Sequence, residues 1–118
     1  MTTTLSAVRR VLVVEDDYFI AQEVARHFAD GGLEVVGPCN NVEEALAAID
    51  EARPDAAVVD INLHGDMAYG VADALVARNI PFVFATGYDA TMIPERFEDV
   101  PRCLKPVILD DLSRALKL

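Results

Sequence analysis

The fold is decided by the stretch Val11-Leu12-Val13-Val14-Glu15-Asp16-Asp17-Tyr18, where four aliphatic residues run into three acids. The aliphatic run is typical of a buried strand, and a helical pattern of apolar residues begins directly after the acids. Neighbouring carboxylates in a confined space repel one another by roughly 1 to 4 kcal/mol per close pair. Either a cation offsets this repulsion or the acids remain in water.

The composition is that of a compact globular protein. The chain has 118 residues, of which 53% are hydrophobic and 25% charged. We expect a single domain over residues 1–118, with its core at about residues 8–117 and no output domain. The start MTTTLSAVRR lacks the apolar core of a signal peptide, and the uncharged runs are too short to span a membrane, so we expect a cytoplasmic protein.

The charge balance restricts the class of partner. A net charge of −10 and a pI near 4.4 argue against nucleic-acid binding, which needs a basic surface, and favour cations or partners with basic surfaces. Cys39 and Cys103 lie on separate predicted strands without metal-type spacing. We therefore expect two reduced thiols that serve as small apolar residues.

Five apolar segments predict strands, at residues 11–14, 34–38, 56–59, 81–85 and 103–104. Helical patterns alternate with them. Their expected inward residues are Ile20, Ala21, Val24, Ala25 and Phe28 in the first helix, Ala45, Leu46 and Ile49 in the second, Val71, Ala72, Leu75 and Val76 in the third, and Leu109, Leu112 and Leu116 in the last. Five parallel strands with helices on both faces make a doubly wound, flavodoxin-like α/β fold.

Several local signals mark the ends of these elements. Gly31-Gly32 ends the first helix, Asn41 with Glu44 predicts a capping box at the second, and Pro106 is expected to open the last. A polar loop is expected through Asn62, His64-Gly65 and Asp66. The segment 91–100 contains Pro94 and only Met92, Ile93 and Phe97 as apolar anchors, so a fourth helix there is expected to be short or irregular.

In an open parallel sheet the functional site lies at the carboxyl ends of the strands. The residues at those ends are Glu15, Asp16 and Asp17, then Asp60, Thr86 and Lys105. Acids, one hydroxyl and one ammonium are what a cation-dependent phosphoryl-transfer site requires. Mg²⁺, or Mn²⁺, takes oxygen ligands and would offset the repulsion between the acids.

Each residue then has an expected role. Asp60 can act as a nucleophile on phosphorus and become an acyl phosphate. Thr86 and Lys105 would hold two phosphoryl oxygens, and Gly87 leaves room for the donor. Asp17 has two readings, as a further acid of the site or as only a helix N-cap. Neither His27 nor His64 is expected to carry chemistry, and the sequence contains no glycine-rich phosphate loop that would bind a nucleotide or flavin cofactor.

The motifs VLVVEDD, VVDINL, FATGYD and CLKP, in this order and spacing, resemble the receiver domain of bacterial two-component response regulators over essentially the whole chain. The resemblance implies that Asp60 accepts phosphate from a histidine kinase or a small phosphodonor. It implies Mg²⁺ bound by Glu15, Asp16, Asp60 and the backbone carbonyl of Asn62, with Asp16 the direct ligand. It implies a switch that catalyses only its own phosphorylation and dephosphorylation, acting on a downstream protein or phosphotransfer partner as a monomer or weak dimer.

Phe84-Ala85-Thr86-Gly87-Tyr88 resembles the signature of the FATGUY subgroup of receivers, which is often linked to kinases of the HWE and related classes. The chain also departs from the common receiver pattern. Arg102 stands where most receivers have the aromatic residue that rotates with the threonine, and Leu63-His64-Gly65-Asp66-Met67 lacks the common proline-glycine-methionine pattern. We therefore expect phosphorylation to order the segment 87–100, with Gly87, Tyr88 and Arg102 as switch residues.

Two other functions fit parts of the sequence. An aspartate-nucleophile phosphatase of the haloacid-dehalogenase kind also has an acid at the end of a parallel strand, but it needs a second acid two residues later, where this chain has Asn62. A flavodoxin-like module or a scaffold receiver that is not phosphorylated is the other alternative. The first strand is not followed by the backbone-donor loop that a flavin phosphate would need.

Overall fold

A computed structural model describes residues 8–87 and 93–118 of the chain. Its main sheet contains β1 (Arg10–Val14), β2 (Glu34–Cys39), β3 (Ala56–Asp60), β6 (Phe82–Thr86) and β7 (Arg102–Leu104). The helices are α1 (Tyr18–Asp30), α2 (Val42–Ala52), α3 (Tyr69–Ala77) and α4 (Leu109–Ala115), and η2 (Glu95–Phe97) is a single 3-10 turn. The remaining strands, β4 (Asn62–Leu63) and β5 (Asp66–Met67), form a separate hairpin.

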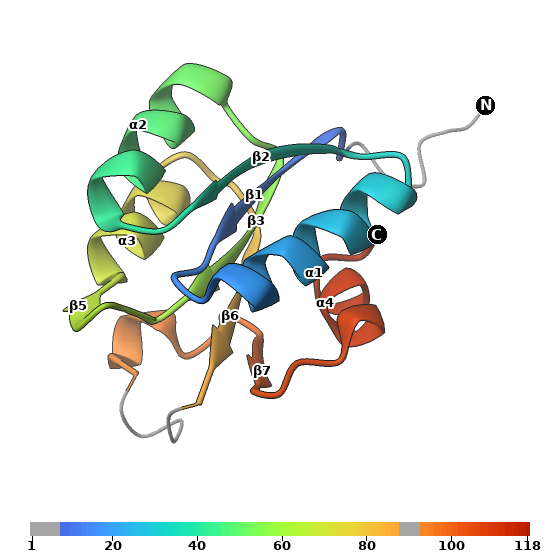
Figure 1. Ribbon diagram of the computed structural model, residues 1–118. Helices are drawn as coiled ribbons and strands as arrows, with labels where there is room; N and C mark the ends of the chain where they lie inside the picture. The colour runs from blue at the N-terminus through green and yellow to red at the C-terminus, as the bar shows by residue number, and fades with distance from the viewer. Residues whose placement is uncertain (1–7, 88–92) are drawn as a thin grey trace.

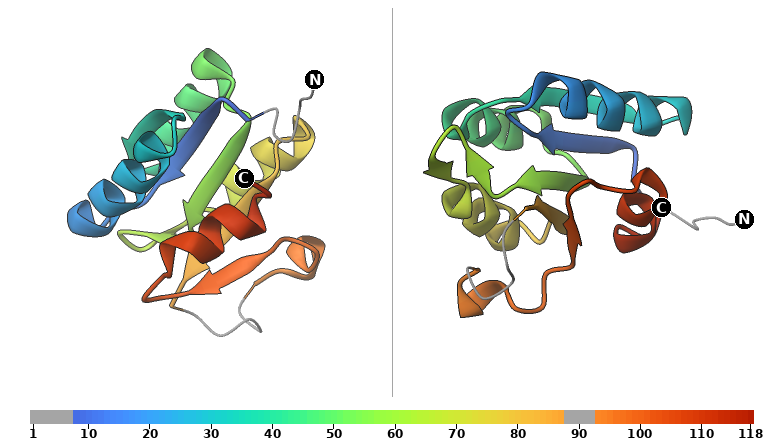
Figure 2. Two further views of the ribbon diagram at one scale, coloured as in Figure 1. Left: turned by 90° about the vertical axis from the view of Figure 1, so that its right-hand side faces the viewer. Right: turned by 60° about the horizontal axis from the view of Figure 1, so that its bottom comes forward.

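The five strands of the main sheet are parallel, in the order β2-β1-β3-β6-β7. Figure 1 shows α1 and α4 on one face of this sheet and α2 and α3 on the other. The two views of Figure 2 show the same three layers, with the helices on either side of the strands. The predicted doubly wound α/β fold is confirmed, because all five strands are parallel and helices pack on both faces of the sheet.

Alternation along the strands divides the interior into two cores. Val11 and Val13 of β1 belong to the cluster under α1 and α4, whereas Leu12 and Val14 belong to the cluster under α2 and α3. Successive side chains of a strand point to opposite faces, so a strand covered on both faces must be apolar throughout. This is why the run before Glu15 contains no polar residue.

The predicted helix-capping interactions are present, except that one capping hydrogen bond has a different donor. The Asn41 side chain accepts the backbone N–H of Glu44 at 2.8 Å and caps α2, as predicted. The Glu44 carboxylate, however, accepts the backbone N–H of Asn40 at 3.3 Å, one residue before the cap. The first helix ends at Gly31, and Ala21, Val24 and Phe28 form its buried face.

Three sequence predictions about elements are wrong. Val76 is 52% exposed, because α3 buries Val71, Ala72 and Leu75 and turns Val76 away from the sheet. The last helix begins at Leu109, three residues after Pro106. The expected loop after Asp60 is the β4–β5 hairpin, in which His64 and Gly65 both have positive φ, at 53° and 91°. A two-residue connection with two positive φ angles matches the twist of antiparallel strands.

The expected irregularity before β7 is confirmed for the described residues 93–100, where η2 is the single helical turn. Ile93 and Phe97 are buried as predicted, and Met92 lies outside the described residues. Within the described part of the chain, no helix has the length and apolar character needed to cross a membrane.

Candidate functional site

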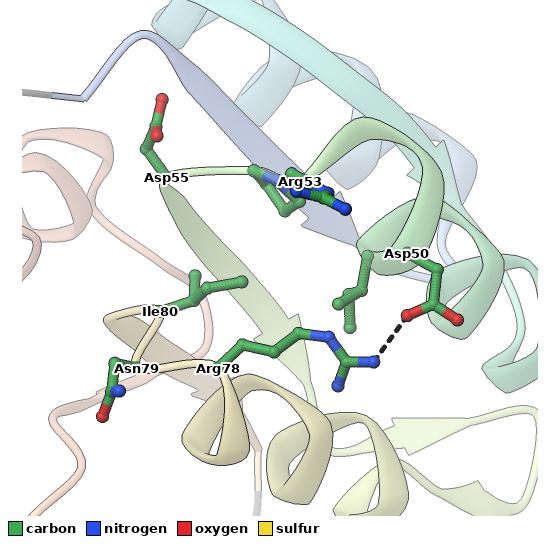
Figure 3. A pocket seen from close by; sticks show the side chains of 8 residues that line it. Asp50, Arg53, Asp55, Arg78, Asn79 and Ile80 are labelled. Carbon is green, nitrogen blue, oxygen red and sulfur yellow. Dashed lines mark hydrogen bonds and ion pairs between the residues drawn. The ribbon is translucent and has the colours of Figure 1, made fainter.

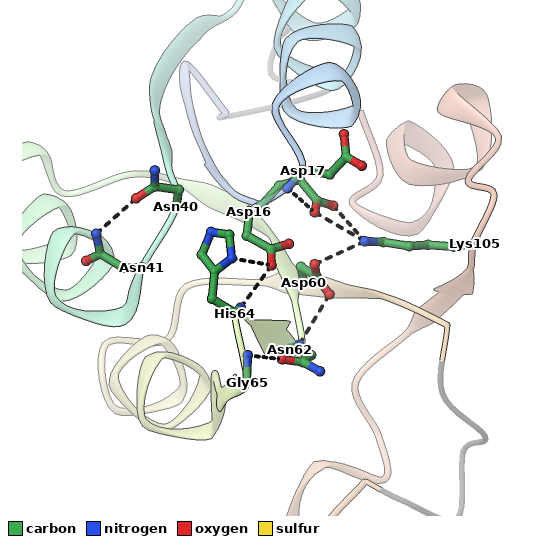
Figure 4. A network of polar contacts seen from close by, with 10 residues as sticks. Asp16, Asp17, Asn40, Asn41, Asp60, Asn62, His64, Gly65 and Lys105 are labelled. Carbon is green, nitrogen blue, oxygen red and sulfur yellow. Dashed lines mark hydrogen bonds and ion pairs between the residues drawn. The ribbon is translucent and has the colours of Figure 1, made fainter.

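Residues from four parts of the sequence meet at the carboxyl ends of the strands, as Figure 4 shows for Asp16, Asp60 and Lys105. Asp60 is the last residue of β3, Thr86 is the last residue of β6, and Lys105 follows β7 directly. The strand register places Asp60 opposite Ala85 and Thr86 opposite Leu104. The sheet therefore brings together the residues that the strand-end rule selected.

Three carboxyl groups form a compact cluster at this rim. One oxygen from each of Glu15, Asp16 and Asp60 can be chosen so that all lie within 4.8 Å of one another. Glu15 is 4% exposed and Asp60 is 5% exposed, whereas the Asp16 side chain is half-buried. Buried carboxylates without compensating charge are strongly unfavourable, so this cluster needs positive charge.

Lys105 supplies part of that charge. Its Nζ lies 3.0 Å from an oxygen of Glu15 and 3.0 Å from Oδ2 of Asp60. One ammonium thus serves two buried carboxyl groups. The pair retains an excess of negative charge unless one carboxyl group binds a proton or a further cation is added.

The acid–base properties of the site follow from this shortage of positive charge. Burial, together with the neighbouring Asp60, raises the pKa of Glu15 to about 7. Burial also raises the pKa of Asp60, although its contacts with Glu15 and Lys105 act in the opposite direction. Burial would lower the pKa of Lys105, but its hydrogen bonds to Asp60 and Glu15 outweigh burial and raise it. In the absence of a divalent cation, the raised pKa favours a proton on Glu15 at pH values below about 7.

Asp16 differs from Glu15 because it has a backbone donor. Its Oδ2 accepts the N–H of His64 at 2.9 Å. Burial would raise the pKa of Asp16, but this hydrogen bond and the contacts with Asp60 and Glu15 lower it overall. Asp16 is therefore ionised at neutral pH and available as a ligand.

Asp17 lies outside the carboxyl cluster and caps α1. Its side chain accepts the backbone N–H of Ile20 at 3.1 Å, which is the N-cap interaction. Its own backbone N–H donates to Glu15 Oε2 at 3.1 Å. The cap reading of Asp17 is confirmed.

The β4–β5 hairpin forms one wall of the site. The backbone N–H of Asn62 donates to Asp60 Oδ1 at 3.3 Å, and the N–H of Gly65 donates to Asn62 Oδ1 at 2.7 Å. His64 lies in the connection of this hairpin, and its backbone N–H, rather than its side chain, donates to Asp16. Nothing local in the sequence signals this contact, which joins residues 48 positions apart.

An open hollow of about 410 Å³ covers Asp60, and its walls are Asp16, Asn62, His64, Gly65, Gly87 and Lys105. Gly87 borders this space, as the sequence predicted for an approach path to Asp60. Thr86 is buried beside it, and its backbone carbonyl accepts the N–H of Lys105 at 2.9 Å. Tyr88, predicted as a switch residue, lies outside the described residues.

Arg102 points toward the end of η2. Its Nη2 donates to the backbone carbonyls of Phe97 at 3.1 Å and of Glu98 and Val100 at 3.4 Å. The two hydrogens of this NH2 group are shared among the three carbonyl oxygens. The residue at the usual aromatic position is therefore an attachment between β7 and the segment before it.

Other polar features lie away from this site. Cys39 and Cys103 are free thiols, as predicted. His27 Nε2 lies 2.8 Å from Ser113 Oγ and joins α1 to α4. A larger hollow of about 590 Å³ lies at the opposite ends of the strands, where Arg78 and Asp50 form an ion pair (Figure 3). Its ionic groups are exposed, so it lacks the buried, mutually perturbed carboxyl groups found beside Lys105.

The donor set at the carboxyl ends suits a hard divalent cation. Glu15, Asp16 and Asp60 offer closely spaced oxygen ligands, and Asn62 lines the same hollow as Asp16 and Asp60. Mg²⁺ binds such oxygens through few carboxylates and retains several waters, which an open hollow allows. The residues present fit the cation that the sequence predicted.

Comparison with known proteins identifies the class. The model of the response regulator receiver domain matches residues 11–101, and the chain belongs to this family. SdrG from Sphingomonas melonis Fr1 is 38% identical, with 96% of this chain and 99% of that chain covered and a TM-score of 0.81. A structure of the BeF3-activated conformation of SdrG, assigned to Pseudomonas melonis Fr1, is 39% identical over 94% of this chain and 95% of that chain, with a TM-score of 0.76.

Longer proteins also match. The positive alginate biosynthesis regulatory protein of Pseudomonas aeruginosa is 35% identical over 91% of this chain and 45% of its own length. The transcriptional regulatory protein PdtaR of Mycobacterium tuberculosis is 27% identical over 93% of this chain and 56% of its own length. The chain thus spans about half the length of these curated relatives.

Proposed function

We propose that this chain is a phosphoacceptor switch of two-component signalling, in which Asp60 receives a phosphoryl group from a histidine kinase. One observation carries the proposal. Asp60 is a buried carboxyl group at the carboxyl end of a central strand, with an ammonium at 3.0 Å on one side and an open hollow above it. A carboxylate there is accessible to a phosphodonor and has a fixed positive charge beside it.

The transfer is a nucleophilic displacement at phosphorus. A carboxylate oxygen of Asp60 forms a bond to phosphorus, while the bond from phosphorus to the donor atom breaks and its electron pair leaves with the donor. The Lys105 Nζ lies 3.0 Å from Asp60 Oδ2, and after the transfer it would bind a negatively charged phosphoryl oxygen. The Thr86 hydroxyl would bind a second oxygen, and Gly87 leaves space for the donor.

A divalent cation, Mg²⁺ or Mn²⁺, would be held by Glu15, Asp16, Asp60 and the backbone carbonyl of Asn62. When bound, it would neutralise charge on the phosphoryl group and offset the repulsion between the acids. Asp16, which a backbone donor keeps ionised, would be the direct ligand. Glu15, which is already near Lys105, would act through water.

The state of Asp60 would reach partners through the segment between Gly87 and Arg102. Arg102 replaces the usual rotating aromatic and binds three carbonyl groups before β7, so a change at Thr86 would be transmitted through this attachment. We propose that phosphorylation orders residues 87–100, of which 88–92 lie outside the described part. Amide exchange in this segment that stays unchanged on adding a phosphoryl analogue would contradict the idea.

The partners follow from the subgroup. The FATGY motif and the likeness to SdrG support membership of the FATGUY subgroup and a cognate kinase of the HWE or a related class. The output would be a change in binding to a downstream protein or a phosphotransfer protein, in the cytoplasm, by a monomer or weak dimer. A phosphatase of the haloacid-dehalogenase kind is less well supported, because Asn62 stands where it needs an acid.

The decisive experiment is phosphotransfer with Asp60→Asn beside the wild type. We expect acid-labile phosphate on the wild-type chain with Mg²⁺ present, from a small acyl-phosphate donor and from the cognate kinase, and none on the variant. Asp66→Asn, which removes an exposed carboxylate of β5, is the matched control and should retain incorporation. Incorporation that survives in Asp60→Asn discards the assignment, and turnover of small phosphoesters would favour the phosphatase.

A further inference from the structure

We propose that His64 provides a nitrogen ligand at the cation site and thereby raises the affinity of this site for Ni²⁺, Cu²⁺ and Zn²⁺ relative to its affinity for Mg²⁺. The inference rests on the proposed cation site of Asp16 and Asp60 and adds a residue to it. His64 lines the same hollow as these two acids. Figure 4 shows its imidazole beside the Asp16 carboxylate, at the rim above Asp60.

The spacing between the two side chains suits a shared ion. His64 Nδ1 lies 3.5 Å from Asp16 Oδ2. Ligand bonds of about 2.0 to 2.1 Å to nitrogen and oxygen place two such atoms about 3.5 Å apart when the angle at the metal is about 115°. This angle is close to tetrahedral. The ligand atoms that lie within 4.8 Å of one another belong to Glu15, Asp16 and Asp60 without His64, so the imidazole must turn toward Asp60 to share an ion with it. The His64 side chain is 67% exposed, so this rotation is open to it.

The backbone keeps His64 at this place. Its N–H donates to Asp16 at 2.9 Å, and its φ of 53° together with that of Gly65 at 91° forms the tight turn between β4 and β5. Leu63, just before the turn, is buried in the core, and Gly65 is held by the Asn62 side chain. The imidazole is therefore attached to an ordered turn, which reduces the entropy lost when it binds an ion.

Ligand chemistry then predicts the preference. Carboxylate and carbonyl oxygens alone suit Mg²⁺ and Mn²⁺, whereas imidazole nitrogen suits Zn²⁺, Cu²⁺ and Ni²⁺. Affinities of a given site for divalent ions rise from Mn²⁺ to Cu²⁺ along the first row, and a nitrogen donor adds to this trend. Mg²⁺ gains little from imidazole because it keeps oxygen ligands and water.

The same contact has another reading, an ordinary ion pair between a protonated imidazole and Asp16. An exposed ion pair contributes little to stability and places no nitrogen on a metal. It predicts that removing the imidazole changes the affinities for Ni²⁺ and Mg²⁺ by the same factor. The two readings therefore differ in a ratio that can be measured.

The experiment compares Ni²⁺ and Mg²⁺ binding by titration calorimetry at one pH above neutrality for wild type, His64→Gly, His64→Asn, His27→Gln and Asp16→Asn. Glycine and asparagine both tolerate positive φ, so the turn and the backbone N–H to Asp16 are retained, and circular dichroism checks folding. We expect His64→Gly and His64→Asn to lose at least about tenfold in Ni²⁺ affinity and less than about twofold in Mg²⁺ affinity. His27→Gln, the matched histidine control, should change neither.

A direct readout is the ring-nitrogen NMR signal of His64 on adding Zn²⁺. Binding should shift the signal of Nδ1 in His64 and leave that of His27 in place. Equal losses for Ni²⁺ and Mg²⁺ in the His64 variants, an unchanged Ni²⁺ affinity, or an unshifted His64 signal would each overturn the proposal. Asp16→Asn distinguishes this proposal from the proposed function, because it should lower the affinities for both Ni²⁺ and Mg²⁺. A Mg²⁺ affinity that is the same in Asp16→Asn as in the wild type would contradict the cation site of the proposed function.

Discussion

Two segments that follow strands of the main sheet differ in how they are held: the β4–β5 hairpin, residues 62–67, and the η2 side, which we define as residues 93–100. The hairpin is joined to the acids by backbone N–H groups, from His64 to Asp16 and from Asn62 to Asp60. The η2 side is joined to the rest of the molecule by side chains. Such attachments depend on rotamers, whereas the hairpin contacts depend on the backbone of one turn.

The η2 side has three kinds of attachment. Phe97 is buried and packs against Tyr69 and Phe84, with ring centroids 6.0 Å and 5.7 Å away. Arg96 forms a two-bond ion pair with Asp73 of α3, and Arg102 binds carbonyl groups at the end of η2. The hairpin beside the cation site is thus held by backbone contacts. The η2 side, which we propose responds to phosphorylation, is held by side-chain contacts that single substitutions can remove one at a time.

The largest expected effect is on the apolar attachment of the η2 side. Phe97 is 1% exposed, so Phe97→Ala should lower the free energy of unfolding by about 3–5 kcal/mol through lost burial and the cavity left behind. Urea denaturation measures this value. Glu95→Ala, on the exposed surface of the same turn, is the control and should cost little. A loss below about 1 kcal/mol for Phe97→Ala would mean that this turn is not part of the core.

The next largest effect concerns Mg²⁺ affinity and distinguishes Asp16, which contacts the hairpin, from Asp17, which caps α1. Asp16→Asn should weaken Mg²⁺ binding by at least about tenfold, because it removes an ionised ligand. Asp17→Asn should change the affinity by less than about twofold, since asparagine also caps a helix. Calorimetric titration with Mg²⁺ measures both. Similar losses for the two variants would show that Asp17 belongs to the cation site.

The buried Glu15–Asp60 pair predicts a pH dependence of stability in the metal-free protein. Glu15 has an ordinary pKa of 4.5 that burial raises to about 7 in the fold, so the folded state holds a proton that the unfolded chain releases. The stability contributed by protonated Glu15 is complete below pH 4.5 and is lost as the pH rises through about 7. One proton changes the unfolding free energy by at most about 1.4 kcal/mol per pH unit.

Glu15→Gln cannot release this proton. Between pH 5 and 7 its unfolding free energy should therefore fall less steeply with pH than that of the wild type, in urea titrations at several pH values with chelator present. Adding Mg²⁺ to the wild type should also reduce the fall, because the cation favours the ionised acids. A variant with the same slope as the wild type would show that Glu15 is ionised in the folded, metal-free state.

The smallest expected effect tests the polar attachment of the η2 side. Arg102→Ala removes the bonds to the carbonyls of Phe97, Glu98 and Val100 and should cost about 0.5–1.5 kcal/mol. Hydrogen exchange should accelerate in residues 94–100 and stay unchanged in the hairpin. Arg102→Lys, which keeps the charge and one donor group, should lie between. Equal acceleration of exchange in the hairpin and in the η2 side would show that Arg102 does not hold the η2 side specifically.

Much of the fold could be predicted from local patterns, because they record burial directly. The run Val11 to Val14 is apolar on both faces since helices cover both sides of the sheet. The caps by Asp17 and Asn41 were predictable because each acts on a backbone group within three residues. Val76 was misassigned because the helical period alone does not say how far around α3 the core extends.

The sequence by itself determined which chemical groups stand at the strand ends, because a parallel sheet places Glu15, Asp60, Thr86 and Lys105 on one rim whatever the loops do. Only the tertiary structure decided how those groups share charge. The Lys105 ammonium lies between Glu15 and Asp60, and the backbone of His64 lies on Asp16. Burial and hydrogen bonding between residues 45 to 90 positions apart set these contacts and the resulting pKa shifts, and no local pattern encodes them.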